Sequence, residues 1–342
     1  MRFVAFTIGL LTSLAWAAPL SPTAKAVIPP NVRQIINLDY RMLRIFGAAM
    51  TLKEQALPNN LRQFETALQN AGVNPDSDLD TLTFASFDDE KKVMHMVAVA
   101  SGPFSSMNIL TQLRLQKLRP IAYLSYDLYP VSKALVMTIL HDDTLLLGDI
   151  AGIKSVLNIR DNRGPTIEIN KDLNEVMRPI EKATVWSVLD REGTQRMLLL
   201  ALGDDPKLAG IASLEQKVIG AYFRMNFRGG VRFDMDVVTS DSASSMALTS
   251  LLKMGILYKK ITTNSAQKMA LGDVSVASKR ISKDSERSDL KMQFKAGDRE
   301  LQTLLRSQCF TSMSNERKEL AGFTSAIVTD DQKGMEGSAR LE

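Results

Sequence analysis

The chain has 342 residues, of which 45% are hydrophobic, and a formal net charge of +4. This length favours two domains of about 150 residues each, and the apolar content is sufficient for ordinary cores. The small positive excess is distributed among acidic residues, so the composition does not indicate a nucleic-acid-binding protein. Cys309 is the one cysteine, which excludes an intramolecular disulfide. We expect it to be a buried, inert thiol, and pairing between two chains is the alternative.

The N-terminus has the pattern of a cleavable secretory signal peptide. Arg2 precedes an apolar run from Phe3 to Trp16, and small residues flank Trp16 before a predicted cut after Ala17. The run is shorter than the roughly twenty apolar residues of a membrane-spanning helix, so an uncleaved anchor is the less favoured alternative. We therefore expect residues 1–17 to be removed on export to the periplasm or the cell exterior. Cleavage leaves 342 − 17 = 325 residues with a formal charge of 41 − 38 = +3.

Three short sequence anchors recur in the same order and predict an internal duplication. Each anchor lies at a junction between predicted elements, and the copies are separated by 151, 139 and 149 residues. The pairs are Leu38-Asp39 with Leu189-Asp190, Ser105-Ser106-Met107 with Ser244-Ser245-Met246, and Gly148-Asp149 with Gly297-Asp298.

The predicted elements of the two copies follow the same order. Apolar residues alternate in the predicted strands and recur at helical spacing between them. In the first copy we expect strands at 32–38, 82–87, 93–100, 123–129, 134–140 and 144–147, with helices near 61–71, at 105–117 and from 149. In the second copy we expect strands at 184–189, 218–227, 231–239, 274–281 and 290–294, with helices at 194–213, 242–258 and from 298.

The predicted fold class is α+β, built as two tandem repeats of a βαββαββα unit. The hairpins favour an antiparallel sheet in each unit, and we expect the helices to pack on one face of each sheet. The predicted organisation is a signal peptide at 1–17, a proline-rich spacer at 18–30, a first unit at 31–163, a linker helix at 164–182, a second unit at 183–311 and a flexible tail at 312–342.

The repeat also predicts which residues face outward. Apolar and charged residues alternate from Val231 to Val237, so the apolar set is expected to face the core. The offset of 139 matches His95 to Asp234, which belongs to the other set. We therefore expect the imidazole of His95 to lie at the surface.

The second histidine, His141, is followed by Asp142 and Asp143, with Asp149 nearby. A tight polar turn between two strands is the favoured interpretation, because aspartate is a common turn residue. A weak calcium or surface-metal site is the alternative. A zinc site is not indicated, since zinc usually needs several histidine or cysteine ligands at short spacing.

Several acidic residues stand at positions where they could be mistaken for a repeated acidic site. A carboxylate at the start of a helix accepts hydrogen bonds from unsatisfied N–H groups, so we interpret four aspartates as helix caps. The glutamates of the linker have basic neighbours and are expected on a solvated face. The aspartates are Asp39, Asp149, Asp190 and Asp298, and the glutamates are Glu168, Glu175 and Glu181.

The sequence contains no nucleophile elbow, phosphate-binding loop or dinucleotide fingerprint. Thr194, Ser244 and Ser282 have no histidine close in sequence, although a Ser–Lys pair assembled in space stays open. The sequence therefore assigns no catalytic, cofactor-binding or metal-binding residue.

Seventeen methionines are many for this length. Most fall on apolar positions of predicted elements, so we interpret them as core residues. An adaptable groove for a lipid or peptide is the alternative. The expected core residues include Met94, Met107, Met137 and Met246, together with Trp186, Phe84 and Phe223.

The chain resembles a broad group of exported bacterial proteins of unknown function built from two tandem α+β units. The residues that carry the resemblance are Leu38-Asp39, the break at 74–80, Leu128-Tyr129 and the run from Leu140 to Asp149. The resemblance covers most of the first unit and is vaguer in the second. It implies the architecture and export, and it supplies no catalytic residue.

These observations favour an exported, non-enzymatic binding or interaction protein of the periplasm or cell envelope. A cleft between the units is the expected ligand site, because clefts at domain interfaces are where ligands usually bind. The expected partner is an envelope protein or an apolar small molecule. One alternative is an envelope hydrolase whose catalytic groups meet only in space, near a histidine or a buried lysine. Another is a carrier of an apolar ligand such as a lipid.

Overall fold

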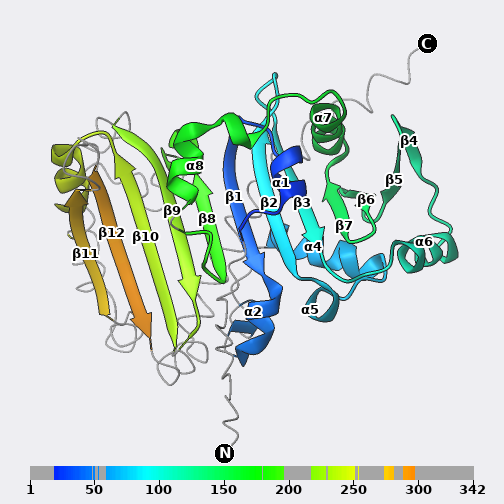
Figure 1. Cartoon of the computed structure of the whole chain (residues 1–342), viewed down its shortest axis with the longest axis horizontal. Coiled ribbons are helices and arrows are strands. Elements are labelled where there is room, and N and C mark those ends of the chain that lie inside the picture. Colours follow the sequence, from blue (N-terminus) through cyan, green and yellow to red (C-terminus); the bar gives the residue numbers. More distant parts are fainter. Residues whose placement is uncertain are drawn as a thin grey trace, which may run out of the picture.

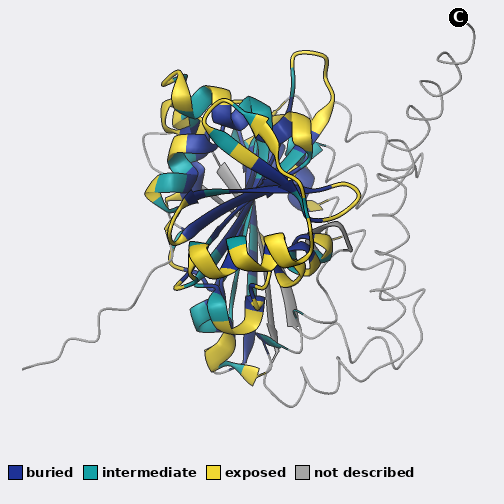
Figure 2. Ribbon diagram, turned by 90° about the vertical axis from the view of Figure 1, so that its right-hand side faces the viewer, coloured by how far each residue is buried: buried dark blue, intermediate teal, exposed yellow. Residues whose placement is uncertain are grey.

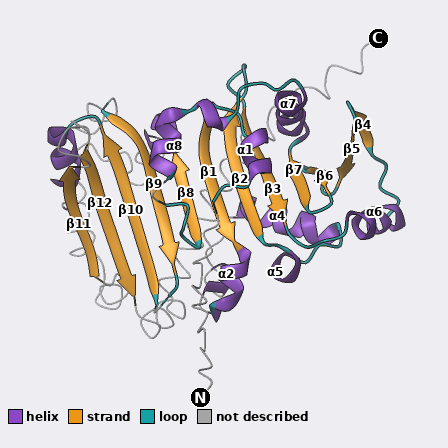
Figure 3. Cartoon of the chain, in the orientation of Figure 1, coloured by secondary structure: helices purple, strands orange, loops and turns teal. Residues whose placement is uncertain are grey.

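The computed structural model describes residues 19–47, 49–50, 53, 59–178, 180–195, 217–228, 230–250, 253, 273–280 and 288–296. These residues form a mixed α+β structure with one large antiparallel sheet (Figures 1 and 3). The strands are β1 (Val32–Asp39), β2 (Thr81–Asp88), β3 (Met94–Ser101), β4 (Ile121–Tyr123), β5 (Tyr126–Pro130), β6 (Val136–His141), β7 (Thr144–Gly148), β8 (Val185–Leu189), β9 (Val218–Asn226), β10 (Val231–Thr239), β11 (Asp273–Arg280) and β12 (Ser288–Ala296).

Helices lie between many of the strands along the chain. Several begin at a side chain that caps free backbone N–H groups, as the sequence predicted for the aspartates. The helices are α1 (Pro22–Val27), α2 (Tyr40–Ile45), α4 (Asn59–Asn70), α5 (Pro75–Asp78), α6 (Ser106–Leu115), α7 (Ile150–Asp161) and α8 (Lys171–Met177), with a 3-10 helix η1 (Ile167–Ile169). Residues 191–195 and 242–250 are also helical.

The strands follow one another in the order β11-β12-β10-β9-β8-β1-β2-β3-β7-β6-β5-β4. In the middle of this order β1 and β8 pair antiparallel, with Gln34 opposite Leu189 and Leu38 opposite Val185. We call this strand pair the seam. The strands from β1 to β4 in this order form the first flank of the sheet, and those from β8 to β11 form the second flank. The sequence predicted a separate sheet in each unit, whereas the seam joins both flanks into one sheet. It does so because the edges of β1 and β8 satisfy each other's backbone groups, which would otherwise remain unpaired.

Helices cover both faces of the sheet, which corrects the expectation of one covered face. The reason is visible in β2, where Leu82 and Phe84 are buried on one face and Ala85 and Phe87 on the other. A strand that is apolar on both sides must be covered on both sides. Figure 2 shows the buried strands between outer surfaces that are exposed. On the face of Phe84 lie α2, α4 and α6, and on the face of Phe87 lie α1, α7, η1 and α8.

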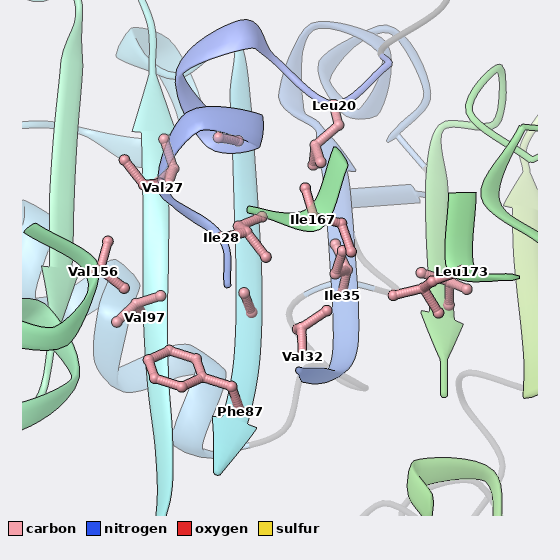
Figure 4. Close-up of a cluster of buried hydrophobic side chains, with 14 of the residues drawn as sticks. Leu20, Val27, Ile28, Val32, Ile35, Phe87, Val97, Val156, Ile167 and Leu173 are labelled. Atoms are coloured by element: carbon pink, nitrogen blue, oxygen red, sulfur yellow. The ribbon is translucent and has the colours of Figure 1, made fainter. Parts of the chain in front are cut away.

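The segment expected to be a spacer is part of the core, which is a second correction. Ser21 caps α1 and Pro22 occupies its first turn, where the missing N–H of proline costs nothing. Leu20, Val27 and Ile28 are at most 2% exposed. Figure 4 shows their side chains gathered over the strands of the first flank. The prolines therefore shape a short helix and its exit, and this segment closes one face of the sheet.

Two local expectations also change. The strand predicted at 123–129 is a hairpin, because Leu124 adopts a positive φ of 52° and the chain reverses there between β4 and β5. Of the methionines expected in the core, Met137 is fully buried, whereas Met94, Met107 and Met246 are 43%, 67% and 57% exposed. The sequence pattern could not distinguish the buried methionine from the exposed ones, because it does not show where a covering helix or strand ends.

Candidate functional site

A pocket of about 310 Å³ lies where α1, η1 and α8 meet, and we call it the seam pocket. These elements lie on the face of the sheet that holds Phe87, and α8 packs against β8 and β9 (Figure 1). The pocket is therefore placed close to the seam. Its lining consists of Lys25, Glu168, Asn174, Met177, Arg178 and Glu181.

Backbone contacts between distant segments hold the walls of the seam pocket in place. The N–H of Ile167 donates to the carbonyl of Ile28 at 2.8 Å. The side-chain amide of Asn170 donates to the carbonyl of Pro30, also at 2.8 Å. Ile167 is fully buried, which anchors η1 to the core beneath it. The segment after α1 and the start of α8 are thus joined, and Lys25 and Glu168 come to line the same pocket.

Asn174 both supports the wall and offers a polar atom to the pocket. Its side-chain nitrogen donates to the carbonyls of Ile167 and Asn170 at 2.8 Å and of Glu168 at 3.2 Å. These bonds fix the amide so that its oxygen is the atom left to accept a hydrogen bond. Within the described residues, no hydrogen bond to that oxygen is formed.

The charges around the seam pocket are balanced and unpaired. Lys25 and Arg178 are cationic, and Glu168 and Glu181 are anionic, so their formal charges sum to zero. In the described part of the chain none of these four groups forms an ion pair within 4.0 Å. Met177 is 2% exposed and forms an apolar floor. This combination provides an apolar contact with donors and acceptors around it, as ligand sites usually do.

Sequence reasoning found only part of this lining. Glu168 and Glu181 were expected on a solvated face; Glu168 is exposed and Glu181 half-buried, and both also line the rim of the pocket, which the sequence did not predict. Lys25 was assigned to a spacer and Arg178 was not singled out. Asn174, Arg178 and Glu181 stand at helical spacing, which could have indicated a shared face. No sequence signal connects that face to Lys25, because well over a hundred residues separate them.

A second polar cluster lies at the end of the strands where β1 begins and β2 and β8 end. The guanidinium of Arg33 is within 3.1 Å of Asp88 and within 2.7 Å of both Asp190 and Glu192. Burial lowers the pKa of Arg33, but bonds and charges from these three carboxylates outweigh that effect and raise it. Burial raises the pKa of Asp190, which the N–H of Gly193 and Arg33 partly offset. Arg33 therefore stays charged and connects both sides of the seam.

His95 is buried, which corrects the expectation of a surface imidazole. Its residue is 7% exposed, and its Nδ1 lies 2.8 Å from Asp149 and its Nε2 3.3 Å from Asp89. The cause is α7, which covers this part of β3 so closely that a Cβ added at Gly152 would lie 3.1 Å from the Cβ of His95. Among the described residues the hydrogen-bonding partners of the ring are carboxylates. A histidine-based hydrolase would place a hydroxyl nucleophile next to the ring, and the partners of His95 among the described residues are Asp149 and Asp89 instead.

Asp234, which the predicted repeat matches to His95, is also buried together with hydrogen-bonding partners. It is 1% exposed and accepts from Arg224 at 2.9 Å and from Arg232 at 3.1 Å. The two residues that the predicted repeat matches are thus both buried, and the outward direction assigned to them was wrong. Each polar side chain is buried together with partners of suitable charge or hydrogen-bonding capacity, as the cost of burying charge demands.

The remaining polar candidates have structural roles. Asp142 and Asp143 form the tight turn between β6 and β7, as predicted, and His141 contacts Arg160 at 3.2 Å. The aspartate caps are also confirmed for the described cases, which are Asp39 for α2, Asp149 for α7 and Asp190 for the helix at 191–195.

Two of the three candidate hydroxyls bond to nearby acceptors. Thr194 donates to the carbonyl of Asp190 at 2.7 Å, and Ser244 donates to Asp241 at 3.0 Å. Ser282, Asp298 and Cys309, like the predicted tail at 312–342, lie outside the described residues. Within the described residues no group of three or more histidine, cysteine or acidic side chains is arranged to hold a metal ion. In the same part of the chain, no helix has both the length and the apolar character needed to cross a bilayer.

No protein family model and no curated protein sequence matches the chain. Among solved structures it is similar to three crystal forms of TP0453. Form I has a TM-score of 0.44 at 9% identity and covers 85% of this chain and 100% of that one. Form IV has a TM-score of 0.44 at 8% identity, covering 91% and 98%, and form III has 0.40 at 7%, covering 86% and 100%.

Proposed function

We propose that this chain is an exported, non-enzymatic binding protein that holds a small ligand in the seam pocket. The observation that carries the proposal is the set of four charged side chains around Met177 that form no ion pair with any described residue. Within the part of the chain that the structure describes, these four groups join no ion-pair network. They are available to a ligand instead, and the buried floor provides the apolar contact that most ligand sites have.

Export is the second part of the proposal and rests on the N-terminal pattern. The charge at Arg2, the short apolar run and the small residues before Ala18 are typical of a signal peptide. The segment lies outside the described residues. Leu20 is the first buried residue after it, so a cut after Ala17 would leave the core of the sheet intact.

We also propose that the two flanks of the seam are copies of one unit. Support comes from strand registers that the sequence offsets anticipate. Ile36 pairs with Phe84, and adding the predicted offsets of 151 and 139 gives Ser187 and Phe223, which pair as well. An unrelated sequence would have no reason to reproduce this register.

The backbone bonds across the seam support the same relation. The N–H of Asp39 donates to the carbonyl of Thr184 at 2.9 Å, and the N–H of Asp190 donates to that of Arg33 at 3.0 Å. Adding 151 to 39 gives 190, and subtracting 151 from 184 gives 33. Exchanging the two proposed copies therefore turns the first bond into the second. This is the pattern expected when two copies pair about a twofold axis.

The third anchor departs from this relation. Ala98 pairs with Leu147, and its counterpart Val237 pairs with Leu290, which gives an offset of 290 − 147 = 143. The anchor sequences Gly148-Asp149 and Gly297-Asp298 are 149 apart. The sequence between this pairing and the anchor glycine is therefore six residues longer in the second flank than in the first.

The test of binding uses a thermal-shift screen with charged, dipolar and apolar small molecules. We expect at least one compound to raise the melting temperature of the wild-type protein, since a ligand that binds only the folded state stabilises it. Glu168→Trp, which places a large side chain at the rim, should abolish that shift. Ile169→Trp is the matched control, because Ile169 is 62% exposed and does not line the pocket. A shift that survives Glu168→Trp, or no shift with any compound, would contradict the proposal.

A further inference from the structure

The charge pattern of the seam pocket restricts the kind of ligand it can hold. Its two cations come from different elements, Lys25 from the last turn of α1 and Arg178 from the end of α8. Its two anions are also separate, Glu168 on η1 and Glu181 beyond α8. Neither sign of charge is therefore confined to one wall.

A ligand of a single charge would be poorly matched to this lining. An anion attracted by Lys25 and Arg178 would also approach Glu168 and Glu181, and each close like-charge contact offsets an attractive one. A neutral apolar molecule would contact Met177 but leave four charged groups partly desolvated without partners, which is costly. A molecule with one anionic and one cationic group can pair with the two cationic side chains and with the two anionic side chains at the same time.

We infer that the seam pocket binds a small zwitterion, with its anionic group at Lys25 and Arg178 and its ammonium group at Glu168 and Glu181. The side-chain oxygen of Asn174, which accepts no hydrogen bond from the described residues, adds an acceptor for the ammonium. Met177 contacts the part of the ligand between the charges. The volume of about 310 Å³ fits a free amino acid, a dipeptide or the headgroup of a zwitterionic lipid. This inference rests on the proposed binding function.

The experiment measures binding of the dipeptide alanyl-leucine by titration calorimetry. Its N-acetylated form and its C-terminal amide each lack one charge. We expect either blocked form to bind at least about tenfold more weakly than the free dipeptide, the usual effect of losing a charged hydrogen bond. Vesicles containing phosphatidylethanolamine, compared with vesicles of phosphatidylglycerol, present the same chemistry as a lipid headgroup. A preference for the free dipeptide over its blocked forms, or for phosphatidylethanolamine over phosphatidylglycerol vesicles, supports the zwitterion, and the arm that shows the preference identifies its source.

Paired variants assign the two ends of the ligand. In Lys25→Gln/Arg178→Gln the free dipeptide and its amide should bind equally, because the groups that sense the carboxylate are gone. In Glu168→Gln/Glu181→Gln the free form should lose most of its advantage over the N-acetylated form, because Asn174 is then the one original acceptor of the proposed ammonium site that remains. Control variants carry the same changes outside the pocket, at the exposed residues Lys182 (Lys182→Gln) and Glu90 (Glu90→Gln), and should behave like the wild-type protein.

Failure of this inference can be separated from failure of the proposed function. If the screen yields only singly charged or uncharged compounds and their effect is lost in Glu168→Trp, the pocket binds a ligand but not a zwitterion. Equal binding of the free and blocked dipeptides would overturn the inference in the same way. If nothing binds, including both vesicle types, then both statements are wrong.

Discussion

Individual buried polar residues in this protein are held by partners from distant parts of the chain. Arg33 contacts three carboxylates, and its side chain is 14% exposed. His95 lies between Asp149 and Asp89. Burial makes an unpartnered charge costly, so each such side chain is accompanied by a compensating group. These clusters account for the most conspicuous polar residues without assigning chemistry to them.

Tyr40 is a further buried polar residue, and it predicts how stability responds to high pH. Its ring is fully buried, and its hydroxyl donates to Glu65. Burial, followed by the charge of Glu65 and this hydrogen bond, raises the pKa of Tyr40 well above its ordinary value of 10.0. The folded state therefore retains the proton more tightly than the unfolded state does.

We therefore expect the contribution of Tyr40 to be complete below pH 10 and lost as the pH rises above it. Chemical unfolding between pH 8 and 12 should show a steeper loss of stability in the wild-type protein than in Tyr40→Phe. At pH 8 the variant should be less stable by about 1 kcal/mol, the usual value of one hydrogen bond. Identical slopes for both proteins above pH 10 would contradict this explanation.

At the scale of the elements, capping and turn residues set where helices and strands end. Asp39, Asp149 and Asp190 each accept a hydrogen bond from an N–H in the first turn of the helix that follows. The sequence alone predicted these caps, because aspartate next to an apolar periodic stretch has a local physical role. It also predicted the turn between β6 and β7, which depends on Asp142 and Asp143.

Close approach of two elements gives a prediction at this scale. Gly102 follows β3, and a Cβ added there would lie 2.0 Å from the carbonyl oxygen of Asp78, at the end of α5. Gly102→Ala must therefore separate these backbones, and overpacking of this kind costs about 3 kcal/mol. Gly47→Ala is the matched control, since no atom lies within 4 Å of its added Cβ. Urea unfolding should show a large loss for Gly102→Ala and little change for Gly47→Ala; equal effects would contradict the stated contact.

At the scale of the whole molecule, the two flanks of the seam share their cores. One buried cluster contains Ile35 of β1 together with Trp186 and Val188 of β8. The cluster on the other face contains Leu38 together with Val231 of β10. The flanks are thus connected by apolar packing as well as by the strand pair, which differs from two domains joined by a linker.

This sharing predicts that the two flanks unfold together. Trp186 is the one tryptophan left after a cut at Ala17, and it is fully buried at the seam. Its fluorescence should therefore change at the same urea concentration as the far-ultraviolet circular dichroism, which reports on all strands and helices. Arg33→Met, which removes contacts across the seam, should lower both midpoints equally. Two separated transitions would show that the flanks are independent.

The sequence by itself determined the features that depend on neighbouring residues. Alternation located most strands, helical spacing located α4, α6 and α7, and aspartates marked helix starts. Turn chemistry succeeded at Asp142-Asp143 and failed at Leu124, whose positive φ has no residue signal in a leucine.

Only the tertiary structure decided how these elements combine. That β1 pairs with β8, that helices cover both faces and that His95 is buried all depend on contacts between residues far apart in the chain. The seam pocket shows the same limit, since Lys25 and Arg178 line one pocket only after α1 packs on the sheet. Local patterns report which face of an element is apolar, but they do not report what covers that face. Which element covers a given face depends on the packing of the whole chain, so the candidate site could be located only in the folded structure.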